Sequence, residues 1–213
     1  YSLLEKEAAG GKFIGVVPQF SHDIRAVVPF TCPEFVRFRM NEFADKNIAS
    51  VASFNVISRH FNEFNLMAEA EWGWNSKGRS IDEFAKAYAV SKNLKDPELF
   101  SKWVVLINQP NYDLAESRFF CRLNENPDLN MFDKMEWDFY FRHSSLIDRE
   151  RLEKDVKMAE EALDVTHKLT DIDLQRESVF VLASLEAFKD LRFISNVIKS
   201  GNISVENRKQ LEV

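Results

Sequence analysis

The sequence lacks the apolar segments that would place the chain in or across a membrane. No run approaches about 20 apolar residues, the length that a helix needs to cross a bilayer. The N-terminal segment YSLLEKEAAGGK has no basic stretch followed by an apolar one, as a secretory signal would. We therefore expect a soluble protein without a membrane partner, either cytoplasmic or secreted after signal removal.

Positive charge is also scarce. Lys and Arg number 28 against 34 Asp and Glu, which gives a net charge of −6 and a pI near 5.4. Binding to nucleic acid depends on clustered Lys and Arg side chains that neutralise phosphates. The composition therefore argues against nucleic acid as a partner.

Cysteine and histidine are too few and too scattered to indicate a metal or redox site. Cys32 and Cys121 have no CxxC spacing, and the 4 His residues do not cluster. The motifs GxGxxG, GxxxxGK(S/T), HExxH and GxSxG are absent, so dinucleotide-binding, P-loop, zinc-protease and serine-hydrolase chemistry lack support. We expect no metal and no cofactor, and we interpret both cysteines as buried free thiols.

The chain is rich in residues that build a hydrophobic core. Hydrophobic residues make up 45% and charged residues 29%, and there are 19 Phe residues. Most of these rings must be buried, because a Phe side chain stabilises a fold by leaving water. A chain of 213 residues is long enough for one large domain or two small ones.

The first third of the chain alternates between extended and helical patterns. Residues 12–18 and 47–57 have the composition of buried strands, and residues 34–46 and 61–74 that of helices. Strand, helix, strand, helix is the repeating order of a parallel sheet with right-handed crossovers. Two such units cannot form a stable parallel sheet alone. We expect an N-terminal remainder of the same protein, or a partner chain, to complete the sheet.

Each predicted helix of this region has a candidate buried face. In the first helix, Phe35, either Phe38 or Arg39, and Phe43 lie near one face. Residues 61–74 fit both a strand and a helix period, but Ala, Leu, Met and Glu favour the helix.

From residue 80 on, the sequence predicts helices joined by short turns. Ser80 and Glu83 form a capping box, and Asp96 stands as an N-cap before a proline. The predicted helices cover residues 81–92, 97–107, 113–123, 131–143, 148–169 and 172–199. The chain is thus mainly α with a small α/β part. It divides into residues 1–78, with the β-α units, and residues 79–213, a multi-helix bundle.

Polar side chains follow both predicted strands. His22 and Asp23 come after the first strand, and Asn55, Arg59 and His60 after the second. Ligands of β-α sheets bind at the carboxyl ends of the strands, where these loops converge. The five side chains could bind a polyhydroxylated ligand through hydrogen bonds. In the alternative interpretation the histidines are surface or capping residues and Arg59 pairs with a carboxylate.

Aromatic and acidic residues near the end of the second predicted helix offer a further candidate. Trp72 and Trp74 could stack on the apolar face of a sugar ring, or they form the joint between the two parts of the chain. Glu69 and Glu71 suggest paired carboxylates, but residues two apart on a helix point in different directions. We therefore do not expect this pair to be catalytic.

The segment AEAEWGWNSKGRSIDEFAKAYA, residues 68–89, resembles the end of the catalytic barrel in glycoside hydrolases related to the β-N-acetylhexosaminidases. There, a final barrel helix with an Ala-Glu and Trp-Asn pattern precedes an acidic-aromatic helix that opens a C-terminal helical domain. The segments LQRESVF and SLEAFKDL also resemble the helices that follow the barrel in this family. The resemblance extends over residues 12–199 in architecture and over about 20 residues in motif.

The resemblance implies a chain that is only part of an enzyme. The family's (β/α)8 barrel has eight strands, of which this chain has room for the last two, and its acidic pair lies at a middle strand. The catalytic residues would then lie outside this chain and are unknown. His22, Asp23, Asn55, Arg59 and His60 would form part of the sugar pocket by their position.

Two functions follow from these observations. In the first, the chain is the C-terminal portion of a carbohydrate-active enzyme that hydrolyses glycosidic bonds and binds a carbohydrate substrate. In the alternative, it is a noncatalytic helical protein-interaction module with a small α/β cap. An exposed apolar patch on the bundle and a self-contained sheet would favour the alternative.

Overall fold

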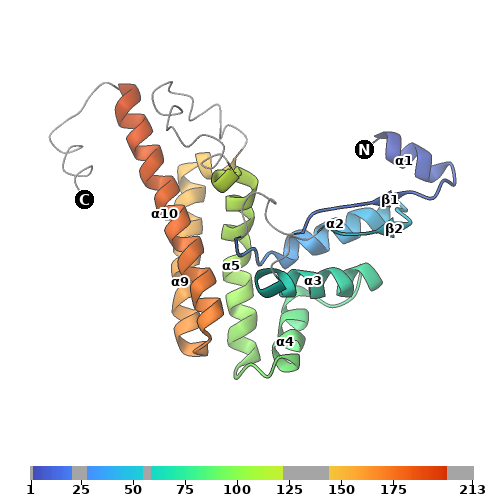
Figure 1. Ribbon diagram of the computed structural model, residues 1–213, viewed down its shortest axis with the longest axis horizontal. Coiled ribbons are helices and arrows are strands. Elements are labelled where there is room, and N and C mark those ends of the chain that lie inside the picture. The colour runs from blue at the N-terminus through green and yellow to red at the C-terminus, as the bar shows by residue number, and fades with distance from the viewer. Residues whose placement is uncertain (1, 21–27, 55–58, 122–143, 201–213) are drawn as a thin grey trace.

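The computed structural model is mainly helical and contains a small parallel sheet (Figure 1). It describes residues 2–20, 28–54, 59–121 and 144–200. The side chains of residues 59–61, 198 and 199 are not described, and the predicted helix at residues 131–143 lies outside the described residues. Within the described ranges, no helix combines the length and the apolar character needed to span a membrane.

The N-terminal part contains the predicted β-α units. Its elements are α1 (Ser2–Ala9), β1 (Gly15–Val16), α2 (Pro33–Asp45), β2 (Ser50–Val51) and α3 (Arg59–Trp74). The strands pair in parallel, so the predicted order of strand, helix, strand, helix is confirmed. Both strands are shorter than predicted. Helix α1 is an addition to the predicted elements, and its Leu, Glu, Lys and Ala residues favour a helix.

The two faces of the sheet have different surroundings. Val16 and Val51 pack against the hydrophobic core beneath the helices. On the other face, Phe13 is 77% exposed, Val17 72% and Phe54 50%. Parallel sheets usually occur with both faces covered. The described part of the chain therefore leaves one face of this sheet bare.

Helix α2 packs mainly against α3, through a narrow apolar face. It begins at Pro33 and buries Val36, Met40 and Phe43, which are spaced four and three residues apart. Phe38 is 65% exposed, so the alternative that placed it on this face is wrong. A residue two positions after Val36 is rotated by about 200° around the helix axis, away from the core.

The rest of the chain forms the helical bundle. Its elements are α4 (Ile81–Ser91), α5 (Pro97–Ser117), η1 (Ser145–Ile147), α9 (Arg149–Leu169) and α10 (Ile172–Ser200). The predicted capping box is present: Ser80 Oγ accepts from Glu83 N at 3.2 Å, and Glu83 Oε2 accepts from Ser80 N at 2.8 Å. Asp96 caps α5 by accepting from Leu99 N at 3.0 Å. Both predicted N-caps are thus confirmed.

Helix α5 is longer than predicted. The expected break between residues 107 and 113 is wrong, because α5 continues through Pro110 to Ser117. A proline inside a helix removes one backbone hydrogen bond and crowds the preceding turn. Asn108 accepts from Glu34 N in the first turn of α2, and Asn111 donates to Thr31 O directly before α2. These tertiary contacts on both sides of Pro110 offset the cost.

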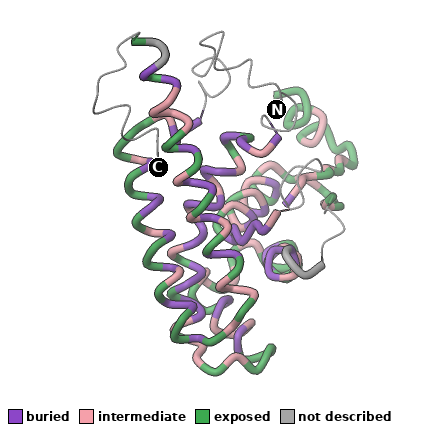
Figure 2. Tube along the Cα trace, turned by 60° about the vertical axis from the view of Figure 1, so that its left-hand side comes forward, coloured by how far each residue is buried: buried purple, intermediate pink, exposed green. Residues whose placement is uncertain are grey.

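One hydrophobic cluster joins the two parts of the chain. The Phe64 ring of α3 lies 5.2 Å from Phe84 of α4 and 5.5 Å from Phe100 of α5, and Trp72 lies 5.0 Å from Phe84. Cys32 and Cys121 are buried free thiols, as predicted. Figure 2 shows buried residues along the inner sides of the helices. The core thus continues across residue 78, and the division into two domains there stays a prediction.

Candidate functional site

The two loops that leave the sheet start at the same edge. Beyond the strands, Ala52 N donates to Val16 O at 3.0 Å, and Phe54 N donates to Pro18 O at 2.8 Å. Gln19 and Phe54 still form a parallel bridge. Ligands of β-α sheets bind at this carboxyl edge, which makes it the first place to look for a site.

The predicted polar ligands belong to this edge by sequence. His22, Asp23 and Asn55 lie outside the described residues. Arg59 and His60 are the first two residues of α3, and their side chains are not described. Their role in binding a sugar therefore stays a prediction.

The two tryptophans lie at the other end of α3. Trp72 has no exposed surface, and its Nε1 donates to Arg79 O at 3.0 Å. Trp74 is the last residue of α3 and is 93% exposed. His60 and Trp74 are separated by about 21 Å along the helix axis. The structure therefore does not bring the tryptophans together with the carboxyl edge, and Trp72 occupies the joint between α3 and α4.

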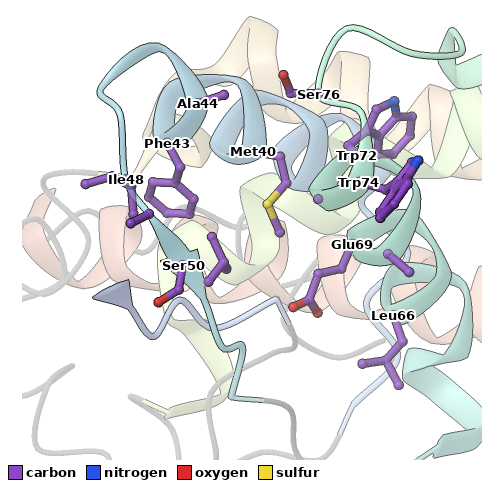
Figure 3. Close-up of a pocket in the computed structure, with 14 residues that line it drawn as sticks. Met40, Phe43, Ala44, Ile48, Ser50, Leu66, Glu69, Trp72, Trp74 and Ser76 are labelled. Carbon is purple, nitrogen blue, oxygen red and sulfur yellow. The ribbon is translucent and has the colours of Figure 1, made fainter. Parts of the chain in front are cut away.

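A groove of about 720 Å³ runs beside Trp74, between α2, β2 and α3 (Figure 3). Its lining includes Met40, Phe43, Ser50, Val51, Leu66 and Glu69. Most of these side chains are apolar and lie on the same side of the sheet as the helices. The groove follows the edge of β2 that does not face β1, so it marks the open edge of the sheet.

Glu69 and Glu71 have separate environments. Glu69 accepts a short hydrogen bond from Ser53 Oγ and lines the groove (Figure 3). Glu71 forms an ion pair with Arg79 at 3.4 Å. The two carboxylates therefore interact with different elements, as expected for residues two apart on a helix.

A buried polar network holds the segment between β1 and α2. Glu177 of α10 accepts hydrogen bonds from Thr31 N at 3.0 Å, from Thr31 Oγ1 at 3.1 Å and from Asn111 Nδ2 at 2.9 Å. Burial raises the pKa of Glu177, while the hydrogen bonds from Asn111 and Thr31 act in the opposite direction. Hydrogen bonds from α5 and α10 of the bundle thus hold the chain in place directly before α2.

Two buried amides complete this network. Asn65 of α3 accepts from Cys32 N at 3.0 Å and donates to the carbonyls of Phe20 at 3.0 Å and Phe30 at 2.5 Å. Asn108 of α5 accepts from Glu34 N at 3.1 Å. The amides pair backbone groups that would otherwise be buried without partners, so helices α3, α5 and α10 jointly fix this loop.

The network was not predicted from the sequence, although α10 contains one local signal of it. Glu177 lies between Leu174 and Val181 in the apolar stripe of α10. A charged residue within such a stripe indicates a buried polar partner. Nothing local in the sequence identifies Thr31 as that partner.

A second pocket, of about 580 Å³, opens beside this loop at the carboxyl edge of β1. Its lining includes Gln19, Glu34, Phe35, Phe38, Gln109 and Tyr112. Rings next to amide groups are suited to a ligand with both apolar and hydroxylated surfaces. Among the described lining residues, Glu34 is the one carboxylate, so the pocket offers binding groups rather than paired acids.

Metal ligands do not gather in the described ranges, where no three His, Cys, Asp or Glu side chains are placed to hold an ion. Comparison of the chain with models of protein families, with curated proteins and with solved structures gave no match.

Substitution of Glu177 tests the loop network. Glu177→Ala leaves the Thr31 and Asn111 donors buried without an acceptor, and we expect a loss of about 3 kcal/mol in the free energy of unfolding. Glu186→Ala, at a surface ion pair on the same helix, should cost less than about 1 kcal/mol. Urea unfolding of the three proteins measures the difference, and equal losses would contradict the network.

The pH dependence of Glu177→Gln provides a second measurement. The pKa of Glu177 is raised above its ordinary value of 4.5. Its protonated carboxyl group therefore contributes fully to the free energy of unfolding at pH values below 4.5. That contribution is lost as pH rises through the folded-state pKa. Gln has no charge to bury, so the stability of Glu177→Gln relative to wild type should increase with pH. A difference that is constant with pH would contradict the raised pKa.

Proposed function

We propose that this chain is the closing portion of a (β/α)8 glycoside hydrolase barrel, followed by a helical domain. The complete protein hydrolyses a glycosidic bond with paired carboxylic acids that lie outside this chain. The chain contributes part of the sugar pocket at the carboxyl edge, through His22, Asp23, Asn55, Arg59 and His60. It needs no cofactor.

The bare face of the parallel sheet is the observation that carries this proposal. Phe13, Val17 and Phe54 lie exposed on the face opposite the helices. In a barrel, that face would point inward and be covered by side chains of the other strands. The parallel order with helices on one side agrees with this arrangement.

The open edge of β2 supports the same conclusion. Ser50 N and Ala52 N donate to carbonyls of β1, so the N–H of Val51, between them, points to the other edge. Helix α3 overhangs that edge and forms the groove that Leu66 and Glu69 line. A further parallel strand would fill the groove and pair with Val51.

The distribution of exposed apolar side chains separates the two candidate functions. In the α/β part, the large exposed ones are Leu3, Leu4, Phe13, Val17, Phe38, Phe54, Met67 and Trp74. In the described bundle they are the aliphatic residues Val90, Val105, Ile172 and Val179, spread over three helices. An interaction module would place its apolar surface on the bundle. The unfinished sheet therefore favours the barrel over the interaction module.

The resemblance of residues 68–89 supplies the reaction class. Helix α3 ends at Trp74, and the capping box at Ser80 starts α4, as in a barrel helix followed by a helical domain. This order of elements supports the proposal without identifying the sugar.

Hydrolysis of aryl glycosides by the native protein tests the proposed function. The protein purified from its source should contain further β-α units, in the same polypeptide or in a partner, and should release the aryl group from at least one glycoside. Aryl N-acetyl-β-hexosaminides are the first substrates to assay. A native chain of 24.8 kDa that binds no partner and cleaves no glycoside would instead support the interaction module.

Substitution of the bare face tests the barrel separately from its chemistry. In the native protein, Val17→Asp should cost about 3 kcal/mol or more, because it would place a carboxylate in the barrel interior. Val90→Asp, at an exposed position of α4, should cost less than about 1 kcal/mol. Thermal unfolding of both variants measures this contrast. Equal small losses would show that the face with Val17 is open to water.

A further inference from the structure

Two buried carboxyl groups of the helical bundle share one guanidinium group. Asp113 of α5 is 1% exposed and Asp155 of α9 is fully buried. The guanidinium of Arg151 serves both: its Nε lies 2.5 Å from Asp113 Oδ2 and 3.7 Å from Asp155 Oδ1. Gln109 Nε2 donates to Asp113 Oδ1 at 2.8 Å.

The two carboxyls are not equally satisfied. Each oxygen of Asp113 accepts from one donor. Neither oxygen of Asp155 accepts from an N–H or hydroxyl group in the described part of the chain. A buried carboxylate without donors is costly, and two adjacent carboxyls that share one proton avoid that cost.

The surrounding charges are few. Lys154, next to Asp155 on α9, acts on it from a distance, and Glu116 of α5 acts on Arg151. Lys189 of α10 forms an ion pair with Glu186 of the same helix. Element η1 consists of Ser, Leu and Ile and has no titratable side chain. Within the described ranges, Arg151 is thus the cation that forms ion pairs with both carboxyls.

The balance of these effects favours the protonated form. Burial, and then the contact with Asp113, raise the pKa of Asp155 to about 8, against the opposing influence of Arg151 and Lys154. The ordinary pKa of the group is 3.8. A group whose pKa is higher in the folded state than in the unfolded state stabilises the fold fully at pH values below its unfolded-state pKa. This stabilisation is lost as pH rises through the folded-state pKa.

We propose that Asp155 is protonated at neutral pH and donates a hydrogen bond to Asp113. This shared proton makes the contact between α5 and α9 sensitive to pH. The free energy of unfolding of the bundle is then highest at mildly acidic pH and decreases at alkaline pH. Asn111, which holds Glu177, precedes Asp113 by two residues on α5, so this contact lies next to the loop network.

Substitution of Asp155 by Asn tests the proposal, because Asn keeps a donor toward Asp113 and has no proton to lose. We compare the unfolding equilibrium constants of the wild type and Asp155→Asn at each pH. The ratio of wild type to Asp155→Asn should rise by up to about tenfold per pH unit between about pH 5 and about pH 8. Asp164→Asn, at an exposed position of the same helix, is the same change of side chain, and its stability should run parallel to that of the wild type. A wild-type to Asp155→Asn ratio that does not change with pH would overturn the proposal.

Infrared spectroscopy keeps the test decisive if Asp155→Asn does not fold. Wild-type protein labelled with ¹³C at the aspartate carboxyl carbon should show a protonated carboxylic acid band at about pH 6, where exposed aspartates are ionised. That band should disappear as pH rises through about 8. Its absence from the wild-type spectrum at about pH 6 would overturn the proposal.

Discussion

The parallel pairing of β1 with β2 constrains how the α/β part of the chain can be completed. Two strands of two residues each supply few backbone hydrogen bonds, and parallel pairs are stable only when their faces are covered. Helices α2 and α3 cover one face, and Phe13 and Val17 remain exposed on the other. This unmet requirement supports the proposed larger sheet more directly than any catalytic motif does.

The bundle takes part in holding the carboxyl edge. Glu177 and Asn111 bind the segment before α2 from α10 and α5, and Asn65 binds it from α3. Buried networks of this kind add specificity because each donor and acceptor needs its one partner. In the proposed enzyme, the helical domain would therefore keep a loop of the sugar pocket in place.

Features set by neighbouring residues could be predicted from the sequence. The capping box at Ser80, the N-cap at Asp96 and the alternation of strand and helix depend on spacings of a few residues. The continuation of α5 through Pro110 depends on contacts with a distant loop, and local rules alone predicted a break there.

The candidate site was less predictable for the same reason. Thr31 and Glu177 are 146 residues apart in the sequence, so no local pattern links them. Trp72 and Trp74 are close in sequence to the polar residues that begin α3, but the rise of the helix moves them to its far end. The sequence offered the joint between the two parts of the chain as one interpretation of both tryptophans. The burial of Trp72 against Phe84 agrees with that interpretation, whereas Trp74 is exposed.

Hydrogen exchange at the edge of β2 tests whether a further strand completes the sheet. The N–H of Val51 points away from β1, whereas the N–H of Ala52 is bonded to Val16 O. If a further strand completes the sheet in the native protein, the amide of Val51 should exchange as slowly as that of Ala52. Rapid exchange at Val51 beside a protected Ala52 would show an open edge and would contradict the barrel.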